Sequence, residues 1–254
     1  MKPGFDLIRR MEELSMNAWP ALQTLLYDGW VLRFADGYTR RANSVNPLYP
    51  SARDVDEKIG ACEQFYRNKG LGTTFKLTAQ STPAELDELL AGRGYQADAH
   101  TAVQLMDLAG WAGTATAEAG LSEDVTEAWL AAFWRMSGTP AEKRATHERM
   151  LRSILPRKRF ASFTVDGQVI ACGLGVLQDR LLGMYDIVTD PGLRRQGYGR
   201  RLIETLLAWG KRDGAQRSYL QVMLNNPPAL ALYAKLGFQE AYRYWYRINP
   251  WVPA

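Results

Sequence analysis

The chain has 254 residues, of which 46% are hydrophobic and 23% are charged. These fractions are ordinary for a globular protein and exclude a disordered, collagenous or coiled-coil chain. Lysine and arginine number 31 against 27 acidic residues, which gives a formal net charge of +4. A nucleic-acid-binding domain ordinarily carries a denser basic surface, so a nucleic-acid partner is not expected.

The sequence has few features that would indicate a membrane span, a secretory signal or disulfide bonds. The sequence has no apolar run of the roughly 20 residues that a membrane span needs, and its charged N-terminus lacks the apolar core of a secretory signal. Two cysteines, Cys62 and Cys172, are too few for a disulfide framework or a closed four-cysteine zinc site. We therefore expect a cytoplasmic protein with reduced thiols, no metal and no membrane partner.

Early in the chain, residues 29–45 predict a strand, a turn and a polar strand end. Four side chains of this segment carry donors suited to a carboxylate, namely Arg33, Arg40, Arg41 and Asn43. They are candidates for binding a carboxylate of the acceptor substrate. The alternative is a solvated hairpin edge.

A pattern of strand, proline at a helix start and glycine–aromatic pair occurs in both halves of the sequence. The glycines that bracket it are separated by 24 residues in the first half, from Gly70 to Gly94. They are separated by 23 residues in the second half, from Gly214 to Gly237. This similarity favours an internal repeat, with a degenerate first copy.

The boundary between the copies is placed by composition. Residues 110–120 hold three glycines among small residues, which is typical of a linker, with a short strand inside it as an alternative. We therefore predict two domains, residues 1–109 and residues 110–254. The first would cap an acceptor pocket of the second, because pockets favour domain interfaces.

The second half alternates helices and strands. A helix is predicted to begin at Ser122 as N-cap, and the Asp166-Gly167 pair predicts a tight hairpin. A later helix is predicted to begin at Asn226, with Pro227 as its first residue. The predicted strands cover residues 160–165, 168–177, 181–189, 218–224 and 241–248. This order predicts a mixed α/β fold with at least one strand–helix–strand crossover.

The segment from Arg194 to Gly199 lies between a predicted strand and a predicted helix. Its two glycines let the backbone turn tightly, and the helix that follows directs free N–H groups into the turn, a geometry that binds phosphate. A dinucleotide fingerprint is excluded because Leu202 stands where a third glycine is required. A P-loop is excluded because the only Gly-Lys pair, Gly210-Lys211, ends a helix.

Three stretches together resemble the GNAT superfamily of acyl-CoA N-acyltransferases. They are Ile187-Val-Thr-Asp-Pro, Arg194-x-x-Gly197-x-Gly199, and the segment from Asn226 through Tyr233 to Gly237-Phe238. The resemblance covers about residues 120–248. It implies a mixed, mostly antiparallel sheet that is splayed between its fourth and fifth strands, with acetyl-CoA in the splay. With the internal repeat, the chain would contain two GNAT-like copies, the first of them degenerate.

The same resemblance implies the residues that bind acetyl-CoA. The pantetheine would follow the backbone of the fourth strand, and the pyrophosphate would bind amides of the glycine loop. The implied cofactor-binding residues are Ile187, Val188, Thr189, Arg194, Gln196, Gly197, Gly199, Arg200 and Asn226.

Two residues are candidates for the chemistry. Tyr233 matches the family's tyrosine whose hydroxyl faces the CoA sulfur and can donate a proton to the leaving thiolate. Asp186 is the first candidate for the general base, with a structural carboxylate as the alternative and Gln221 and Tyr185 as further candidates. By strand alternation, Asp186 would point away from the face that Tyr185 and Ile187 share.

The predicted activity is acetyl transfer from acetyl-CoA to a primary amine of a small or amino-acid-like acceptor, by direct attack in a ternary complex. The protein would act as a monomer or homodimer. One alternative is a tandem aminoacyl- or thiol-conjugating transferase, in which the basic segment Lys143–Arg159 faces RNA or another anion. Otherwise that segment is a solvated helix face that carries His147. The other alternative is a non-catalytic acyl-CoA sensor.

Overall fold

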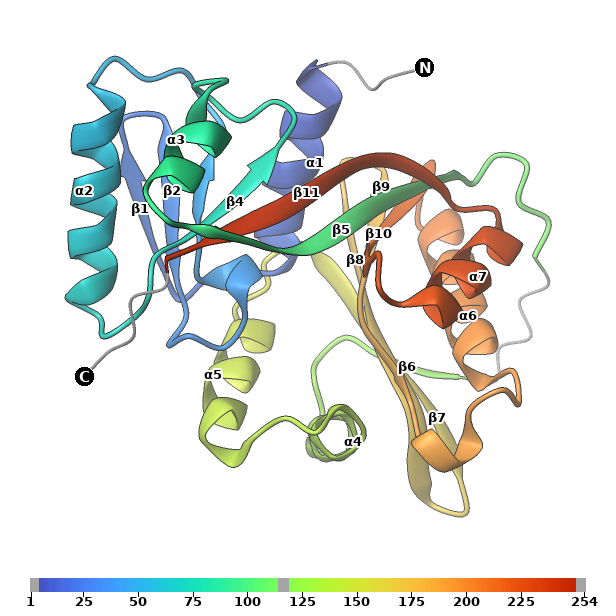
Figure 1. The fold of residues 1–254 in the computed structure, drawn as a ribbon. Coiled ribbons are helices and arrows are strands. Elements are labelled where there is room, and N and C mark those ends of the chain that lie inside the picture. Colours follow the sequence, from blue (N-terminus) through green and yellow to red (C-terminus); the bar gives the residue numbers. More distant parts are fainter. Residues whose placement is uncertain (1–4, 114–118, 250–254) are drawn as a thin grey trace. The chain divides into compact units, whose positions relative to one another are not determined.

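A computed structural model describes residues 5–113 and 119–249. Contacts divide the chain into two compact units with interleaved sequence ranges (Figure 1). Unit 1 holds the described parts of residues 1–102, 223–225 and 241–254, and unit 2 holds those of residues 103–222 and 226–240. The predicted linker falls partly on residues 114–118, outside the described residues, and the division of the repeated copies after residue 109 stays a prediction.

Unit 1 contains a sheet with helices. Its elements are α1 (Phe5–Ala18), β1 (Gln23–Tyr27), β2 (Trp30–Phe34), the 3-10 helix η1 (Arg40–Ala42), β3 (Val45–Pro47), α2 (Val55–Arg67), β4 (Thr74–Thr78), α3 (Leu86–Gly92) and the first part of β5 (Gln96–Asp107). β1, β2 and β3 pair antiparallel in sequence order, and β3 pairs parallel with β4. Its core is formed by buried apolar side chains, including Trp30, Leu32, Ile59 and Phe75.

Unit 2 has the helices and strands that the second half of the sequence predicts, with β6, α5 and the 3-10 helix η2 in addition. They are β6 (Gly120–Ser122), α4 (Glu127–Ser137), α5 (Ala141–Arg152), β7 (Arg157–Val165), β8 (Gln168–Gln178), β9 (Leu181–Thr189), the 3-10 helix η2 (Pro191–Leu193), α6 (Tyr198–Arg212), β10 (Arg217–Met223), α7 (Pro227–Leu236) and the start of β11 (Gln239–Ile248). β6 to β9 pair antiparallel in order, and β10 pairs parallel with β9. The mixed α/β fold is confirmed.

The first helix of unit 2 begins later than predicted. Ser122 belongs to β6, where it pairs with Phe160 of β7. Thr126 is the N-cap, because its side chain accepts a hydrogen bond from the Trp129 amide at 3.2 Å. The predicted cap was wrong because pairing with β7, a long-range contact, holds Ser122 extended.

The two units share an order of elements. In each, a helix precedes an antiparallel three-strand meander, which is followed by a helix, a strand, a helix and a last strand. The parallel pair occupies the same place in both, as β3 with β4 and as β9 with β10. This repeated order supports the internal repeat inferred from the glycine spacing.

The last strand of each half takes part in both units. Residues 103–107 of β5 belong to unit 2, where the Leu108 amide donates to the Gln216 carbonyl at 2.9 Å. Residues 241–248 of β11 belong to unit 1, where Tyr244–Ile248 pair antiparallel with Thr74–Thr78 of β4. The aromatic C-terminal strand therefore pairs within its own chain, with a strand from the first half.

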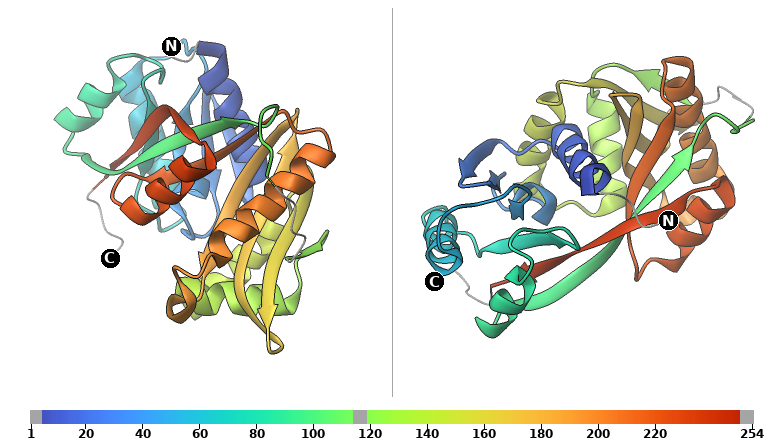
Figure 2. Two further views of the ribbon diagram at one scale, coloured as in Figure 1. Left: turned by 90° about the vertical axis from the view of Figure 1, so that its right-hand side faces the viewer. Right: turned by 90° about the horizontal axis from the view of Figure 1, so that it is seen from above.

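Two helices cover opposite faces of the unit 2 sheet (Figure 2). A Cβ on Gly175 of β8 would touch Leu206 and Trp209 of α6, so that face lies under α6. On the other face, Trp129 of α4 packs edge-on against Phe160 of β7, with ring centroids 5.3 Å apart.

The parallel strands β9 and β10 pair over only part of their length. Leu181–Met184 pair with Arg217–Leu220, although β9 continues to Thr189 and β10 to Met223. Within the described ranges no further pairs join them, so the strands part after Met184 and Leu220. The predicted splay between the fourth and fifth strands is therefore present, counting β6 as the first.

Gly183 lies just before the strands part, and we expect Gly183→Ala to destabilise unit 2 by about 1–3 kcal/mol, the usual cost of overpacking. A Cβ there would lie 2.7 Å from the Tyr219 ring and 2.8 Å from that of Tyr185. Both rings are buried, and their hydroxyls hydrogen-bond at 2.8 Å. Urea unfolding would measure the loss. Gly192→Ala is the control, because its Cβ would meet only the Asp190 carboxylate at an ordinary 3.5 Å.

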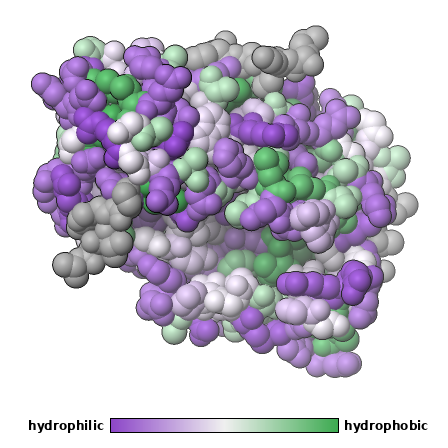
Figure 3. Space-filling view, viewed as in Figure 1, coloured by the Kyte–Doolittle hydropathy of each residue, from purple (hydrophilic) through white to green (hydrophobic). Residues whose placement is uncertain are grey.

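Among the described residues, the large hydrophobic side chains that are exposed are Leu25, Leu26, Leu121, Leu155, Val165 and Met223. The face in Figure 3 is mostly hydrophilic, and hydrophobic residues form smaller groups on it. No helix in the described part of the chain is both long enough and apolar enough to cross a membrane. Residues 5–113 and 119–249 also contain no group of three or more His, Cys, Asp or Glu side chains that could hold a metal ion.

Candidate active site

A β-bulge sits on β9 at the point where β9 and β10 part. Cys172 pairs with Val188 but Leu174 pairs with Tyr185, so one residue of β8 faces two of β9. Asp186 is one of these two and has a φ of 51°, in the left-handed region. A bulge of this kind re-aims a side chain next to a site.

The bulge corrects the predicted alternation along β9. A Cβ on Gly173 would meet Ile187 and Leu202 of α6, so Ile187 faces α6. Tyr185 pairs with Leu174, the neighbour of Gly173, and therefore lies on the opposite face. The prediction that Tyr185 and Ile187 share a face is wrong, because the extra residue shifts the two-residue period.

Asp186 hydrogen-bonds a buried histidine. His147 of α5 places its Nε2 3.0 Å from Asp186 Oδ2, and the indole Nε1–H of Trp134 in α4 donates to His147 Nδ1 at 3.0 Å. The His147 side chain is fully buried and that of Asp186 is 8% exposed. The prediction that His147 lies on a solvated charged face is wrong.

The Trp134 bond determines the tautomer of His147. An indole N–H can only donate, so Nδ1 must present its lone pair. The proton of the neutral ring is then on Nε2, which donates to the Asp186 carboxylate. Phe133 lies against the ring, with centroids 4.8 Å apart, which gives the imidazole an apolar wall.

Sequence reasoning missed His147 and Trp134 as site residues. The basic residues around His147 suggested a solvated helix. A sequence pattern was nevertheless present, because Thr146, His147, Met150 and Leu151 recur at helical spacing and are the buried residues of α5.

The glycine loop presents a free helix N-terminus. Gly197 is the N-cap of α6 with a φ of 88°, makes no side-chain cap, and is followed by no acidic residue in the first turn. Arg194, Gln196 and Arg200 are exposed around it. The first N–H groups of a helix without a side-chain cap attract anions.

This loop lies against the end of β9. A Cβ on Gly199 would be 3.3 Å from Thr189 Oγ1, so the first turn of α6 touches the last residue of the strand. The predicted residues of β9 and of the loop are thus brought together. Asn226 and Tyr233 lie instead on α7, which follows β10.

The corresponding helix of unit 1 begins differently. The Asp54 carboxylate caps α2 by accepting from the Asp56 and Glu57 amides, and both of those residues are acidic. These amides are occupied and the local charge is negative. The first copy therefore lacks an anion site at this helix, in agreement with a degenerate copy.

Asn226 precedes α7 as its N-cap, and Tyr233 lies in the second turn of the helix. The Asn226 Oδ1 accepts from the Ala229 amide at 3.3 Å, which confirms the predicted N-cap. The Tyr233 ring packs edge-on against Phe238, with centroids 6.1 Å apart. Burial raises the pKa of Tyr233 to about 12, and its hydroxyl has no hydrogen-bond partner among the described residues. Tyr233 therefore keeps its proton at neutral pH and can donate it.

Arg33 and Asn43 have structural roles and cannot bind a carboxylate of an acceptor substrate. Arg33 is 3% exposed, and its guanidinium donates to the carbonyls of Met16, Trp19 and Arg41. Asn43 accepts from two backbone amides and donates to two carbonyls. The carboxylate-binding prediction is wrong for both, because long-range packing directs their donors to the backbone.

The other two donors, Arg40 and Arg41, also contact other side chains. Arg40 pairs with Asp98 at 2.6 Å, and Arg41 lies over the Trp19 ring, 5.0 Å from its centroid.

Three arginines of the basic segment Lys143–Arg159 form ion pairs with carboxylates, one inside the segment and two outside it. Arg157 pairs with Asp213 at 2.6 Å, Arg159 with Glu123 at 2.6 Å and Arg152 with Glu148 at 2.8 Å. These pairs offset the positive charge that an RNA or another polyanion would need.

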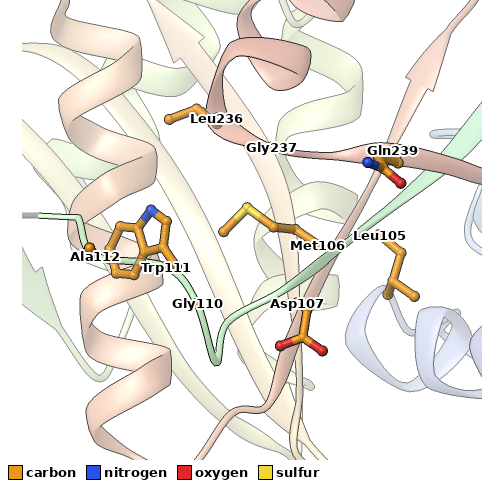
Figure 4. A pocket seen from close by; sticks show the side chains of 9 residues that line it. All are labelled: Leu105, Met106, Asp107, Gly110, Trp111, Ala112, Leu236, Gly237 and Gln239. Atoms are coloured by element: carbon orange, nitrogen blue, oxygen red, sulfur yellow. The ribbon is translucent and has the colours of Figure 1, made fainter.

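A cavity of about 400 Å³ lies elsewhere in unit 2 (Figure 4). It is lined by residues of the β5 end, the segment after it, and the C-terminal end of α7, including Met106, Trp111, Leu236 and Gly237. None of the predicted site residues lines it, so we assign it no part in the chemistry.

Comparisons with known proteins agree with this architecture. The family described as "Probable histone acetyltransferase Rv0428c C-terminal" matches residues 6–247. The chain is 30% identical over 251 residues to YobR, an uncharacterized N-acetyltransferase of Bacillus subtilis (strain 168), which covers 96% of this chain and 99% of the relative.

Solved structures show the same fold. A GCN5-related N-acetyltransferase from Kribbella flavida aligns with a TM-score of 0.69 at 15% identity, over 96% of this chain and 95% of that one. A tandem GNAT protein from the clavulanic acid biosynthesis pathway aligns with a TM-score of 0.61 at 14% identity, over 94% and 88%. The chain therefore belongs to the Rv0428c acetyltransferase family of the GNAT superfamily and is an N-acyltransferase.

Proposed function

We propose that this enzyme transfers an acetyl group from acetyl-CoA to a primary amine of a small or amino-acid-like acceptor, by direct attack within a ternary complex. The observation that carries the proposal is the end of β9. There the strand leaves β10, bulges at Asp186, and reaches the uncapped N-terminus of α6.

The residues present fit acetyl-CoA. The amides that open α6 have no side-chain cap, and the first turn of the helix holds no acidic residue, as binding of a pyrophosphate requires. The loop that carries Arg194, Gln196, Gly197 and Arg200 is exposed. Beyond Met184, the edge of β9 that faces β10 is unpaired within the described residues, so the backbone of residues 187–189 can pair with the amides of a pantetheine.

Acetyl-CoA supplies the activated acyl group as a thioester. Asp186 accepts the proton that a protonated amine must lose before it attacks. Tyr233 donates a proton to the departing sulfur, since burial keeps the hydroxyl protonated. Backbone N–H groups of the parted segment of β9 stabilise the oxyanion. This sequence of proton transfers needs no covalent enzyme intermediate.

The names of related proteins support an amine acceptor without fixing its size. Besides a probable histone acetyltransferase of Mycobacterium tuberculosis, the relatives include an aminoglycoside N(6')-acetyltransferase of Serratia marcescens. The latter is 31% identical over 135 residues, 47% of this chain. The ion pairs of Arg152, Arg157 and Arg159 with carboxylates disfavour the conjugating alternative with an RNA partner.

Acetyl-CoA titration followed by turnover tests the proposal. At about 100 times its Kd, a ligand stabilises a protein by about 2.7 kcal/mol, or about 5–10 °C in Tm at this size. Release of the CoA thiol would then be followed with three amine acceptors in turn: lysine amide, a peptide with an N-terminal alanine, and an aminoglycoside. A Tm shift without turnover on any amine would favour the acyl-CoA sensor. No shift would contradict acetyl-CoA as the donor.

A further inference from the structure

His147 contacts Asp186 from a buried position that neither the family resemblance nor the sequence predicts. We propose that His147 is a positioning residue, an inference that rests on the proposed role of Asp186. Trp134 holds His147 as the neutral Nε2–H tautomer. His147 in turn orients the Asp186 carboxylate as a base without relaying the proton.

The hydrogen bonds leave one carboxylate oxygen for the reaction. Nε2–H of His147 engages Asp186 Oδ2 at 3.0 Å. Oδ1 has no hydrogen-bond partner among the described residues, and the side chain is 8% exposed. Asp186 therefore has one oxygen fixed by the protein and one that can take the proton of an ammonium group.

The proton balance ends at Asp186. An ammonium group gives one proton to Oδ1, which yields a neutral amine and a neutral carboxylic acid; the acid later returns the proton to water. Transfer through His147 would require a proton to leave from Nδ1. That atom carries no proton, and its lone pair accepts the Trp134 N–H at 3.0 Å. The His147 imidazole therefore cannot relay a proton from Asp186.

A neutral hydrogen-bond partner, His147, is compatible with a role of Asp186 as a base. A cation in contact with a carboxylate strongly favours the ionised form and so weakens the group as a proton acceptor. No lysine or arginine forms an ion pair with Asp186 within the described residues. Arg135 of α4 is held by Asp190 at 2.5 Å. Cys172 of β8 is a buried thiol whose pKa is raised by burial and by Asp186, so it adds no charge.

Three variants separate these functions in the full-length enzyme, assayed with the most active amine of the panel. His147→Gln keeps an N–H donor, His147→Phe removes it, and Asp186→Asn removes the base. We expect His147→Phe to lower kcat by about 10–100-fold, the size of a misplaced catalytic group. His147→Gln should recover most of that loss, and the KM for acetyl-CoA should not change. Equal losses in the Gln and Phe variants would overturn the positioning role.

A spectroscopic test does not depend on activity or on the folding of a variant. Long-range ¹H–¹⁵N NMR of the wild-type protein should show His147 with an unprotonated Nδ1 and a proton on Nε2. Trp134→Phe removes the indole donor, so a population with the proton on Nδ1 should then appear. A wild-type ring that carries its proton on Nδ1 would overturn the assigned tautomer.

Failure of the proposed function has a different result. If Asp186→Asn keeps wild-type kcat, Asp186 is not the base and the proposed mechanism fails. If Asp186→Asn is inactive while His147→Phe keeps wild-type kcat, only the role of His147 fails.

Discussion

Tyr233→Phe is expected to lower kcat by about 100-fold or more and to leave the Kd for acetyl-CoA unchanged. The substitution removes only the hydroxyl, so the ring still packs against Phe238. A positioned proton donor contributes typically about 10²–10⁴-fold. Burial, which raises the pKa of Tyr233 to about 12, keeps the donor protonated through the neutral range. The loss should therefore be the same at every pH up to about one unit below that value.

The measurement is kcat against pH for both proteins, with acetyl-CoA affinity determined by titration calorimetry. Tyr27→Phe is a matched control, because it also removes one phenolic hydroxyl, here from β1 of unit 1. An unchanged kcat in Tyr233→Phe would contradict the proton-donor role. Weaker acetyl-CoA binding in that variant would instead assign the hydroxyl to ground-state binding.

Gly197→Glu is expected to weaken acetyl-CoA binding by about 100-fold or more. The new carboxylate would stand at the N-terminus of α6, where the pyrophosphate is proposed to bind. Juxtaposing like charges costs several kcal/mol, and about 1.4 kcal/mol corresponds to a factor of ten in Kd. Titration calorimetry at low and high salt would measure the loss, which should be partly screened at high salt.

Two controls separate charge from backbone strain. Gly197→Ala introduces only a Cβ, which would meet no atom within 4 Å, so its cost is the left-handed φ of 88°. That cost is about 1–2 kcal/mol of stability. Gly138→Glu adds the same side chain at a φ of 70°, at the C-cap of α4, and should leave acetyl-CoA binding intact. Comparable losses of binding in Gly138→Glu and Gly197→Glu would contradict the location of the anion site.

Local sequence alone determined the features that depend on a few neighbouring residues. Asp166-Gly167 predicts a hairpin, and both residues have positive φ values, 50° and 77°. Asn226 predicts the start of α7 and caps it. The strand predicted at residues 181–189 has those bounds in β9. Turn and cap preferences act over one to four residues, so the sequence contains the information they need.

Contacts between distant residues were decided by the tertiary structure alone. The partner of β11 is β4, more than 150 residues earlier in the chain, and no local pattern specifies that pairing. The bulge that turns Asp186 toward His147 exists only as a register between β8 and β9. A strand's register depends on its partner, and one residue of slip moves every side chain to the other face. The family motif could therefore indicate Asp186 as a candidate, but only the fold places His147 and Trp134 behind it.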